Sequence, residues 1–478
     1  MDPIRIQHPS IEERRARGKA ARAETPLSSH AKWTPSADRP DPIALLEEQN
    51  ATRDSDLVPV RHGRMMVSPF TFYRGSARIM AADLKDTPRA GLTTQLCGDA
   101  HLSNFGVFAS PERTLLFDLN DFDETLPGPF EYDVKRMAAS FTIAARNNGF
   151  GRAEARDATL ASVKAYRKAM TQFAQMRTMD IWYARLSERD LTKALSRFVR
   201  KNQDKAQRMS LRQREMAAGK AIQKAHTRDS LQALSKLAEV VDGKQRIVSQ
   251  PPIVVPARDL HATYGLSREE LEHHVHAEFR AYRATLQSDR RHLLERFEIV
   301  DMARKVVGVG SVGTRAFIVL LQGRDQQDPL FLQVKEATAS VLEDHLPRSR
   351  HRQPGSRVVH GQRMMQAASD IYLGWTKGVQ ADRYLYWRQL RDMKGSAVVE
   401  SMIPSVLAFY AGLCGWTLAR AHARSGDPAT INAYLGKSDR FDQSIADFSR
   451  RYADQNERDY EAFAEAIRSG RLSAIEGV

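Results

Sequence analysis

Apolar residues recur at helical spacing through much of the chain. Between about 131 and 240 they return every three or four positions, for example at Val134, Met137, Ala138, Phe141 and Ala145. Residues at these steps share one face of an α-helix, so the pattern predicts helices that bury that face. Asp41 is a candidate N-cap for an earlier helix. Helices are also expected near 41–60, 76–84 and 267–297 and through 396–478, including 407–423.

A different pattern occupies residues 301–335. Two short apolar runs, Phe317–Leu321 and Leu330–Val334, are separated by a polar turn, and a glycine-rich stretch precedes the first run. This alternation predicts three short strands joined by a glycine loop and a turn. Elsewhere the pattern predicts helices near 338–345 and 357–369, strands at 371–376 and 384–393, an extended segment at 64–75 and a strand ending at 118.

These elements predict an α+β protein with a small, mostly antiparallel β part and a large helical part. A chain of 478 residues is long enough for more than one domain. The expected divisions are a flexible basic arm (1–40), the part with the candidate catalytic residues (41–150), a helical part (151–300), a β part (301–395) and C-terminal helices that complete the large part (396–478).

The composition, 42% hydrophobic and 27% charged, is typical of a soluble globular protein. The N-terminus has no apolar segment of the signal-peptide type, and no window approaches the 18 consecutive apolar residues of a membrane span. We therefore expect a cytoplasmic protein. Cys97 and Cys414 are the only cysteines, which argues against a disulfide framework and against a zinc site built on cysteine.

The formal charge of +14 attracts anions of any kind. Residues 186–235 are especially basic and helical in pattern, which could indicate a nucleic-acid module. No zinc finger or RNP-type motif accompanies them, so a solvated helical surface is the preferred interpretation and nucleic acid is not the expected partner. The pattern leaves the oligomeric state open.

The segment with the most chemical content is Cys97–Asp133. It places a carboxylate, Asp99, and an amide, Asn104, on one loop, and a second carboxylate, Asp118, at the end of a short apolar strand. Metal-dependent phosphoryl transfer needs a base for the acceptor hydroxyl and an Asn and an Asp for Mg²⁺. Asp99 is the candidate base, Asn104 and Asp118 the candidate ligands, and Asp121 a candidate second ligand.

Gly308, Gly310 and Gly313 form a G-x-G-x-x-G string that contains Ser311. In a dinucleotide-binding unit such a string opens a helix, but here a β-branched apolar run follows. We therefore expect a glycine-rich hairpin over the phosphates of ATP. Lys335, at the end of the third strand, is where a phosphate-pairing lysine would lie.

Other chemistries explain fewer of these residues. A two-carboxylate hydrolase built on Asp99 and Asp118 leaves Asn104, the glycine hairpin and Lys335 without a role. No G-x-S-x-G elbow is present for Ser-His-Asp catalysis. The acidic run 118–124 lacks the glycine of an EF-hand loop in either register, although a solvated acidic turn would explain Asp123 and Glu124.

Gly98–Asn104 resembles the catalytic loop of aminoglycoside and choline phosphotransferases, within the protein-kinase-like superfamily. Phe117-Asp118 resembles the hydrophobic residue and Asp that hold magnesium there, and Glu131–Asp133 is similar to a structural aspartate that follows. This resemblance implies a two-lobe kinase-like fold. Over nearly its whole length the chain also resembles a bacterial family known only as a domain of unknown function, which has no activity to transfer.

Two features depart from the kinase-like pattern. Cys97 replaces the usual His or Arg before the catalytic Asp, and the glycine hairpin with Lys335 follows Asp99 in the chain instead of preceding it. The resemblance therefore implies a circular permutation, which is physically permissible because a site depends on assembled geometry. It further implies that 407–423 packs beneath the catalytic loop and that an acid after Lys335, with Glu343 preferred to Glu336, pairs with this lysine.

The expected activity is Mg²⁺- and ATP-dependent phosphoryl transfer to a hydroxyl of an unidentified acceptor, a small molecule in preference to a protein. Cys97 and the reversed order also leave open a kinase-like pseudoenzyme or scaffold that acts through protein contacts. A basic nucleic-acid-binding protein that uses residues 186–235 is the remaining alternative.

Overall fold

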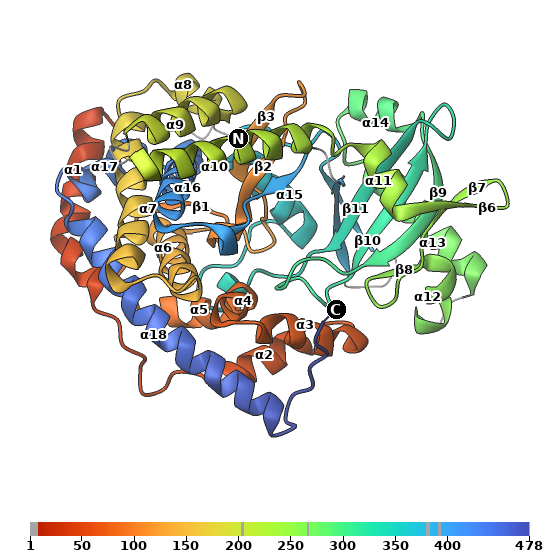
Figure 1. Ribbon diagram of the computed structural model, residues 1–478, viewed down its shortest axis with the longest axis horizontal. Helices are drawn as coiled ribbons and strands as arrows, with labels where there is room; N and C mark the ends of the chain where they lie inside the picture. The colour runs from red at the N-terminus through yellow and green to blue at the C-terminus, as the bar shows by residue number, and fades with distance from the viewer. Residues whose placement is uncertain (1–7, 202–204, 265–266, 379–382, 391–392, 478) are drawn as a thin grey trace, which may run out of the picture.

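The computed structural model describes residues 8–201, 205–264, 267–378, 383–390 and 393–477. A helical part and a six-stranded sheet lie side by side, with short strands between them (Figure 1). Every strand pairing in these ranges is antiparallel. The predicted α+β class with antiparallel sheets is confirmed.

Long helices with one apolar face build the helical part. The predicted face of α6 (Phe130–Asn147) is buried at Val134, Met137, Ala138, Phe141 and Ala145, as the spacing required. The helix predicted at 407–423 is present as α16, and its residues Tyr410 and Leu418 belong to the same core. Besides α6, this part contains α7 (Arg152–Phe173), α16 (Pro404–Ser425), α17 (Pro428–Leu435) and α18 (Arg440–Arg468).

The six-stranded sheet contains the three strands predicted from the glycine-rich region. Its spatial order is β12-β13-β11-β10-β9-β8. Lys335 on β11 lies opposite Ala316 on β10 and opposite Tyr386 on β13. The strands are β8 (Val254–Pro256), β9 (Glu298–Lys305), β10 (Ala316–Gln322), β11 (Pro329–Glu336), β12 (Gly374–Lys377) and β13 (Tyr384–Gln389).

Helices cover the sheet and connect its strands. The chain between β11 and β12 contains a short 3₁₀ helix, Val341–Asp344, and then α15 (Pro354–Met365). On α13 (Arg268–Arg283), Tyr282 stacks on Trp387 of β13 with ring centroids 4.6 Å apart. The remaining helices near this sheet are α11 (Ser230–Leu237), α12 (Ala257–Tyr264) and α14 (Ser288–Leu294), and β6 (Ala238–Val241) with β7 (Lys244–Ile247) forms a hairpin.

Short strands between the two parts present the loops that contain the candidate residues. β1 (Thr93–Leu96) pairs with β4 (Leu126–Pro129), and β2 (Phe105–Ala109) pairs with β3 (Leu115–Leu119). Two-residue strands extend the second pair on either side, β5 (Leu186–Ser187) beside β3 and β14 (Gly395–Ser396) beside β2.

Residues 11–33 do not form the loose arm expected from their composition. α1 (Ile11–Glu24) begins at a Ser10–Glu13 capping box, and Gly18 packs so closely on α17 that a Cβ would lie 2.2 Å from the Thr430 carbonyl oxygen. Trp33 is buried beside Tyr452 of α18. The residues that they contact lie more than 390 positions later in the sequence, and composition alone does not predict such contacts.

The prediction of an extended segment at 64–75 is wrong. The chain forms α3 (Val58–Met66) and α4 (Pro69–Gly75) there. Ser68 caps the Thr71 amide, and Pro69 occupies the first turn, which stops one helix and starts the next. The helix predicted with Asp41 as its N-cap is confirmed as α2 (Pro42–Asn50), and the one near 76–84 is α5 (Ala77–Leu84).

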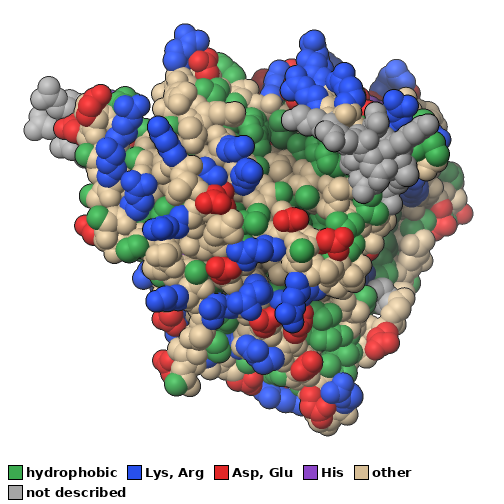
Figure 2. All heavy atoms as spheres, turned by 60° about the vertical axis from the view of Figure 1, so that its left-hand side comes forward, with side chains coloured by type: hydrophobic (Ala, Val, Ile, Leu, Met, Phe, Trp, Pro, Cys, Tyr) green, Lys and Arg blue, Asp and Glu red, His purple; other side chains and the backbone are tan. Residues whose placement is uncertain are grey.

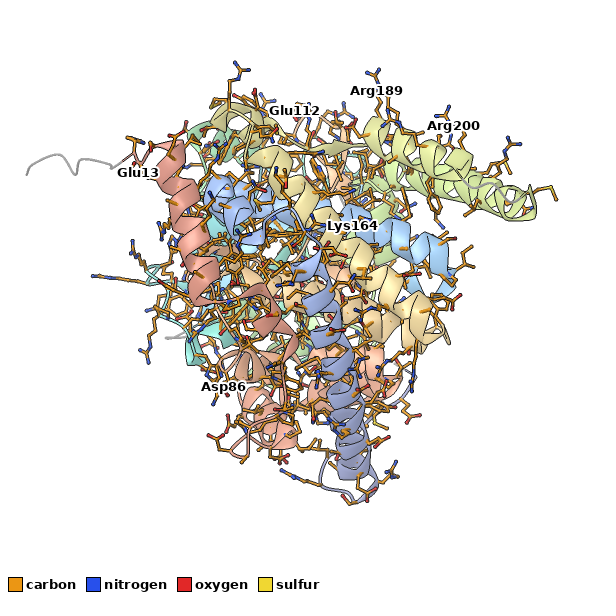
Figure 3. All side chains as sticks on the ribbon, turned by 90° about the vertical axis from the view of Figure 1, so that its left-hand side faces the viewer. Glu13, Asp86, Glu112, Lys164, Arg189 and Arg200 are labelled. Carbon is orange, nitrogen blue, oxygen red and sulfur yellow. The ribbon has the colours of Figure 1, made fainter. Side chains whose placement is uncertain are left out.

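Most of the described part of the basic region 186–235 is helical, in α9 (Glu188–Lys201), α10 (Lys205–His226) and α11, and Leu186–Ser187 forms the short strand β5. Figure 3 shows Arg189 and Arg200 pointing away from the rest of the molecule. On the face drawn in Figure 2, Lys and Arg side chains are spread out with Asp and Glu side chains between them.

A helix that crosses a membrane must be both long and apolar. Within the described ranges, none of them combines the length and the apolar character needed to traverse a membrane.

Candidate functional site

The loop that follows β1 is held from below by the first turn of α6. The Asp133 carboxylate accepts hydrogen bonds from the amides of Cys97 (2.8 Å) and Gly98 (3.0 Å). His422 of α16 lies 3.2 Å from the same carboxylate. Gly98 has φ +84°, and a Cβ there would lie 2.2 Å from the Glu124 carbonyl oxygen, so only glycine fits. The loop is therefore fixed at its base.

Asp99 extends from this loop, and one of its two carboxylate oxygens accepts a hydrogen bond from the protein. Arg136 Nε donates to Asp99 Oδ1 at 2.7 Å, and the guanidinium lies 3.8 Å from the centre of the Tyr73 ring. Asn104 Nδ2 donates to the Asp99 carbonyl oxygen at 2.7 Å, which ties the two candidate residues together. Burial lowers the pKa of the neighbouring His101 well below its ordinary value and keeps that ring neutral.

Asp118 does not occupy the position expected of a metal ligand. Its side chain is 1% exposed and contacts Arg420 of α16. The second carboxylate oxygen accepts from the Ala367 amide at 2.8 Å. In the described structure neither of the two cavities reported below is lined by Asp118. Its carboxylate is saturated by an arginine 302 residues away in sequence, which makes it a structural anchor.

Asp121 is the carboxylate that fits a cation. It lies just beyond the end of β3, its side chain is 34% exposed, and it lines both cavities. Its buried Oδ1 atom has no hydrogen-bond partner within the described ranges and lies 3.6 Å from Lys335 Nζ. Asn104 lines the first cavity beside it. A buried, unsatisfied carboxylate oxygen next to an amide is a donor set suited to Mg²⁺.

The structure brings Lys335 to the acidic loop 118–124. Its side chain is 3% exposed, and its Nζ contacts Asp123 as well as lying near Asp121. Burial favours loss of the proton, but the two carboxylates outweigh it and raise the pKa of Lys335 above its ordinary value. The Tyr386 hydroxyl donates to Asp123 at 2.5 Å, so Asp123 joins two strands of the sheet to the loop.

Glu343 does not pair with Lys335. One of its carboxylate oxygens accepts from the Ser340 amide at 3.1 Å and the other from the Ser349 amide at 3.2 Å, so it caps a short 3₁₀ helix. Glu336 is occupied as well, because Arg383 Nη1 lies 2.6 Å from its carboxylate. The acid that contacts Lys335 is Asp123, for which the sequence had offered a solvated turn as one explanation.

The glycine loop between β9 and β10 is held by the helices that precede the catalytic loop. Arg64 donates to the Gly308 carbonyl oxygen at 2.6 Å, and the Asp54 amide donates to the Gly313 carbonyl oxygen at 2.8 Å. Arg53 donates to the Val312 carbonyl oxygen. Gly308 (φ +67°) and Gly313 (φ +85°) adopt the left-handed conformation. Sequence reasoning did not predict this contact between 53–64 and the loop.

Two cavities adjoin at these residues. The first, of about 330 Å³, is lined by Asp99, Asn104 and Asp123 together with Gly310. The second, of about 380 Å³, is lined by Lys335, Lys394 and apolar side chains that include Phe108 and Leu390. Asp121, Gly308 and Ser311 line both. The first cavity, with both acidic and basic side chains, and the second, with polar and apolar ones, therefore meet at Asp121 and the glycine loop.

Several residues that line the cavities or contact the candidate residues had no signal in the sequence. Arg420, Tyr386, Arg53 and Arg74 lie in ordinary-looking segments and meet the site through tertiary contacts alone. Clusters of three or more His, Cys, Asp or Glu side chains that could hold a metal ion by themselves do not occur in the described part of the chain. Any Mg²⁺ would need phosphate or water oxygens in addition to Asp121 and Asn104, as is usual for this ion.

Comparison with known proteins places the chain in a family. No curated protein and no solved structure matches it. Residues 53–466 match a family described as an uncharacterised protein conserved in bacteria (DUF2252). Except for Glu48, Gln49 and Thr52, all residues that line the two cavities fall within the matched range. The chain therefore belongs to this bacterial family, DUF2252.

Proposed function

We propose that this protein is an ATP- and Mg²⁺-dependent phosphotransferase with a circularly permuted, kinase-like arrangement of two lobes. The order of parts along β9–β13 supports the proposal. A glycine loop joins the first two strands, a lysine lies on the third, and a helix follows before the next two strands. Protein kinases place a glycine-rich loop, a third-strand lysine and a following helix in this order.

The loop that contains Asp99 supports the same assignment from the other end of the chain. In kinases an Asp on the catalytic loop receives the hydroxyl proton, an Asn five residues later holds metal, and an Asp followed by Phe holds metal as well. Asp99, Asn104 and Asp121-Phe122 have these residue types, and the three polar side chains line one cavity. Asp121 takes the role that the sequence resemblance had suggested for Asp118.

The proposed reaction transfers the terminal phosphoryl group of ATP to an acceptor hydroxyl. The bond between the acceptor oxygen and phosphorus forms as the bond to the ADP oxygen breaks, and the hydroxyl proton passes to Asp99. Glycine-loop amides and Lys335 hold the phosphates, while Asp121 and Asn104 hold the metal. Bound Mg²⁺ would neutralise phosphate charge. Most of the rate enhancement would come from positioning and from charge stabilisation.

One observation carries the proposal. Lys335 and Asp121 lie 3.6 Å apart at the junction of the two cavities, although more than two hundred residues separate them in sequence. A buried lysine beside a carboxylate with an unsatisfied oxygen, under a glycine loop, is an arrangement suited to a metal-bound polyphosphate.

Calorimetry with Mg²⁺ and a non-hydrolysable ATP analogue tests the nucleotide site. We expect Asp121→Asn and Lys335→Ala each to weaken binding roughly tenfold or more, because charged hydrogen bonds of this type contribute about 1.5–3 kcal/mol. Lys377→Ala, an exposed lysine on β12, is the matched control and should bind as the wild type does. Undiminished affinity in both site variants would refute the assigned roles.

A transfer assay separates an enzyme from a nucleotide-binding scaffold. Purified protein is incubated with ATP labelled in the terminal phosphate and with pooled hydroxyl-bearing metabolites. The proposal expects label in an acceptor with the wild type and none with Asp99→Asn, while nucleotide affinity is retained in that variant. Nucleotide binding without transfer to any pool would favour the scaffold.

A further inference from the structure

The first cavity contains two arginines that have no carboxylate partner. Arg74, in the last turn of α4, and Arg53, just after α2, both line it together with Asp99. Both side chains have a buried Nε atom without a hydrogen-bond partner among the described residues. Both residues are half-buried, and a buried donor atom left without a partner is destabilising unless a ligand satisfies it.

Arg74 is the more isolated of the two. Its side chain makes no hydrogen bond or ion pair with any residue that the structure describes. Burial lowers the pKa of its guanidinium below the ordinary value, and the negative charges of Glu400 and Asp99 only partly oppose this. Arg74 and Asp99 both line the first cavity.

Arg53 is tied to the glycine loop on one side only. Arg53 donates one hydrogen bond to the Val312 carbonyl oxygen. It forms no ion pair within 4.0 Å with any Asp or Glu that the structure describes. Burial lowers its pKa to about 10, so it remains a cation at neutral pH. Its remaining donors are available to a ligand between the loop and α4.

The carboxylates of the cavity are mostly engaged elsewhere. Asp99 is paired with Arg136, and Asp123 with Lys335. Asp121 also lies near Lys335, Glu336 pairs with Arg315 and Arg383, and Glu48 and Asp344 pair with Arg78.

Glu124 also leaves the two arginines without a full counter-charge. Burial raises the pKa of its carboxyl to about 7, so at neutral pH it carries only part of a negative charge. Among the described residues, therefore, neither Arg53 nor Arg74 has a carboxylate at ion-pair distance, and the charges that act on them come from groups farther away.

We propose that Arg74 and Arg53 bind an anionic group of the acceptor, a phosphate ester or a carboxylate, while the acceptor hydroxyl is held at Asp99. This inference rests on the proposed phosphotransferase function and adds the chemical class of its acceptor. Guanidinium groups suit it, because their planar donors match the oxygens of both anions. Arg74 lines only the first cavity and Lys335 only the second, so the proposal places the acceptor anion on the side of the glycine loop away from Lys335.

Calorimetric titration with inorganic phosphate, on protein saturated with Mg²⁺ and the non-hydrolysable ATP analogue, tests this site. We expect phosphate to bind the wild type, and Arg74→Ala and Arg53→Ala each to weaken that binding roughly tenfold or more. Nucleotide affinity in Arg74→Ala should stay within a factor of about three of the wild type. Arg17→Ala, on the exposed side of α1, is the matched control.

Three outcomes would overturn the inference. Phosphate affinity could be equal in Arg74→Ala and the wild type. The nucleotide analogue could abolish phosphate binding, which would place the anion in the nucleotide's own phosphate site. The melting temperature of ligand-free Arg74→Ala could fall, which would make Arg74 a structural residue. Removal of an unpaired buried charge should instead leave the melting temperature unchanged or raise it.

The inference and the proposed function can fail separately. If the wild type binds no nucleotide analogue, the proposed function fails, and phosphate titration of the nucleotide-free wild type and Arg74→Ala still decides on the anion site. A second titration with malonate separates the two acceptor classes. Tighter binding of phosphate indicates a phosphate ester, and tighter binding of malonate indicates a carboxylate.

Discussion

At the scale of single residues, the most consequential distinction is between Asp118 and Asp121. Both follow the apolar run of β3, and the sequence motif alone favours Asp118. The structure distinguishes the two, because Arg420 contacts the buried Asp118 carboxylate, whereas Asp121 lines both cavities. The motif therefore predicts that a metal-binding carboxylate lies here, while its identity depends on a partner 302 residues away.

The two aspartates should respond in opposite ways to substitution by asparagine. Asp118→Asn leaves Arg420 buried without a counter-charge, so we expect a loss of roughly 3–5 kcal/mol of unfolding free energy. The remaining folded protein should bind Mg²⁺ and nucleotide normally. Asp121→Asn should fold with nearly wild-type stability and lose Mg²⁺-dependent nucleotide affinity. Urea denaturation and calorimetry on both variants measure the two effects, and the reverse pattern would restore Asp118 as the ligand.

Glu124 makes a pH-dependent contribution to stability. Burial raises its pKa from 4.5 to about 7 in the folded protein, so between these values the folded state binds more protons than the unfolded state. Stability due to this group therefore falls as pH rises from 4.5 to 7 and stays low above 7. We expect Glu124→Gln to gain stability relative to the wild type between pH 5 and pH 8. A difference in melting temperature that is constant over this range would contradict the expectation.

At the scale of elements, periodicity predicts what depends on local spacing. It identifies α6, α16 and the three strands around the glycine loop, because each buries one regular face. It fails for 64–75, where a serine cap and a proline outweigh an aromatic, strand-like composition. The motifs draw attention to Asp99, Asn104, Asp121 and Lys335. The hydrogen bonds that Arg53 and Arg64 donate to the glycine loop, in contrast, can be seen only in the assembled fold.

The first turn of α6 and the catalytic loop should behave as one unit. Asp133→Asn replaces a carboxylate oxygen with an amide that faces the Cys97 and Gly98 amides, so hydrogen bonds are lost at the base of the loop. We expect a loss of roughly 1–3 kcal/mol in stability. Phosphoryl transfer should fall by more than the folded fraction does, because Asp99 is displaced. Asp157→Asn, on the exposed side of α7, is the control, and equal loss of activity and folded fraction would limit Asp133 to a role in stability.

At the scale of the whole molecule, the first and last parts of the chain close around the site. Arg39 pairs with Asp83 of α5 and with Asp459 of α18, and Tyr452 of α18 donates to the same Asp83 at 3.0 Å. The α5 end of this network is continuous with α4, which presents Arg74 to the first cavity. Residues that the composition assigns to a flexible arm therefore pack against the helices that lead to the first cavity.

Trp33 tests whether this closure stabilises the fold. Its ring is 7% exposed and lies 5.1 Å from the Tyr452 ring and 6.2 Å from the Phe448 ring, centre to centre. Trp33→Ala should lower the free energy of unfolding by roughly 3–5 kcal/mol, the usual effect of removing a large buried aromatic side chain. Replacing Arg15 and Arg17 of α1 by alanine should change it by less than about 0.5 kcal/mol, because both are exposed. Urea denaturation curves measure both values. An unchanged midpoint in Trp33→Ala would mean that residues 11–33 are held as loosely as their composition suggests.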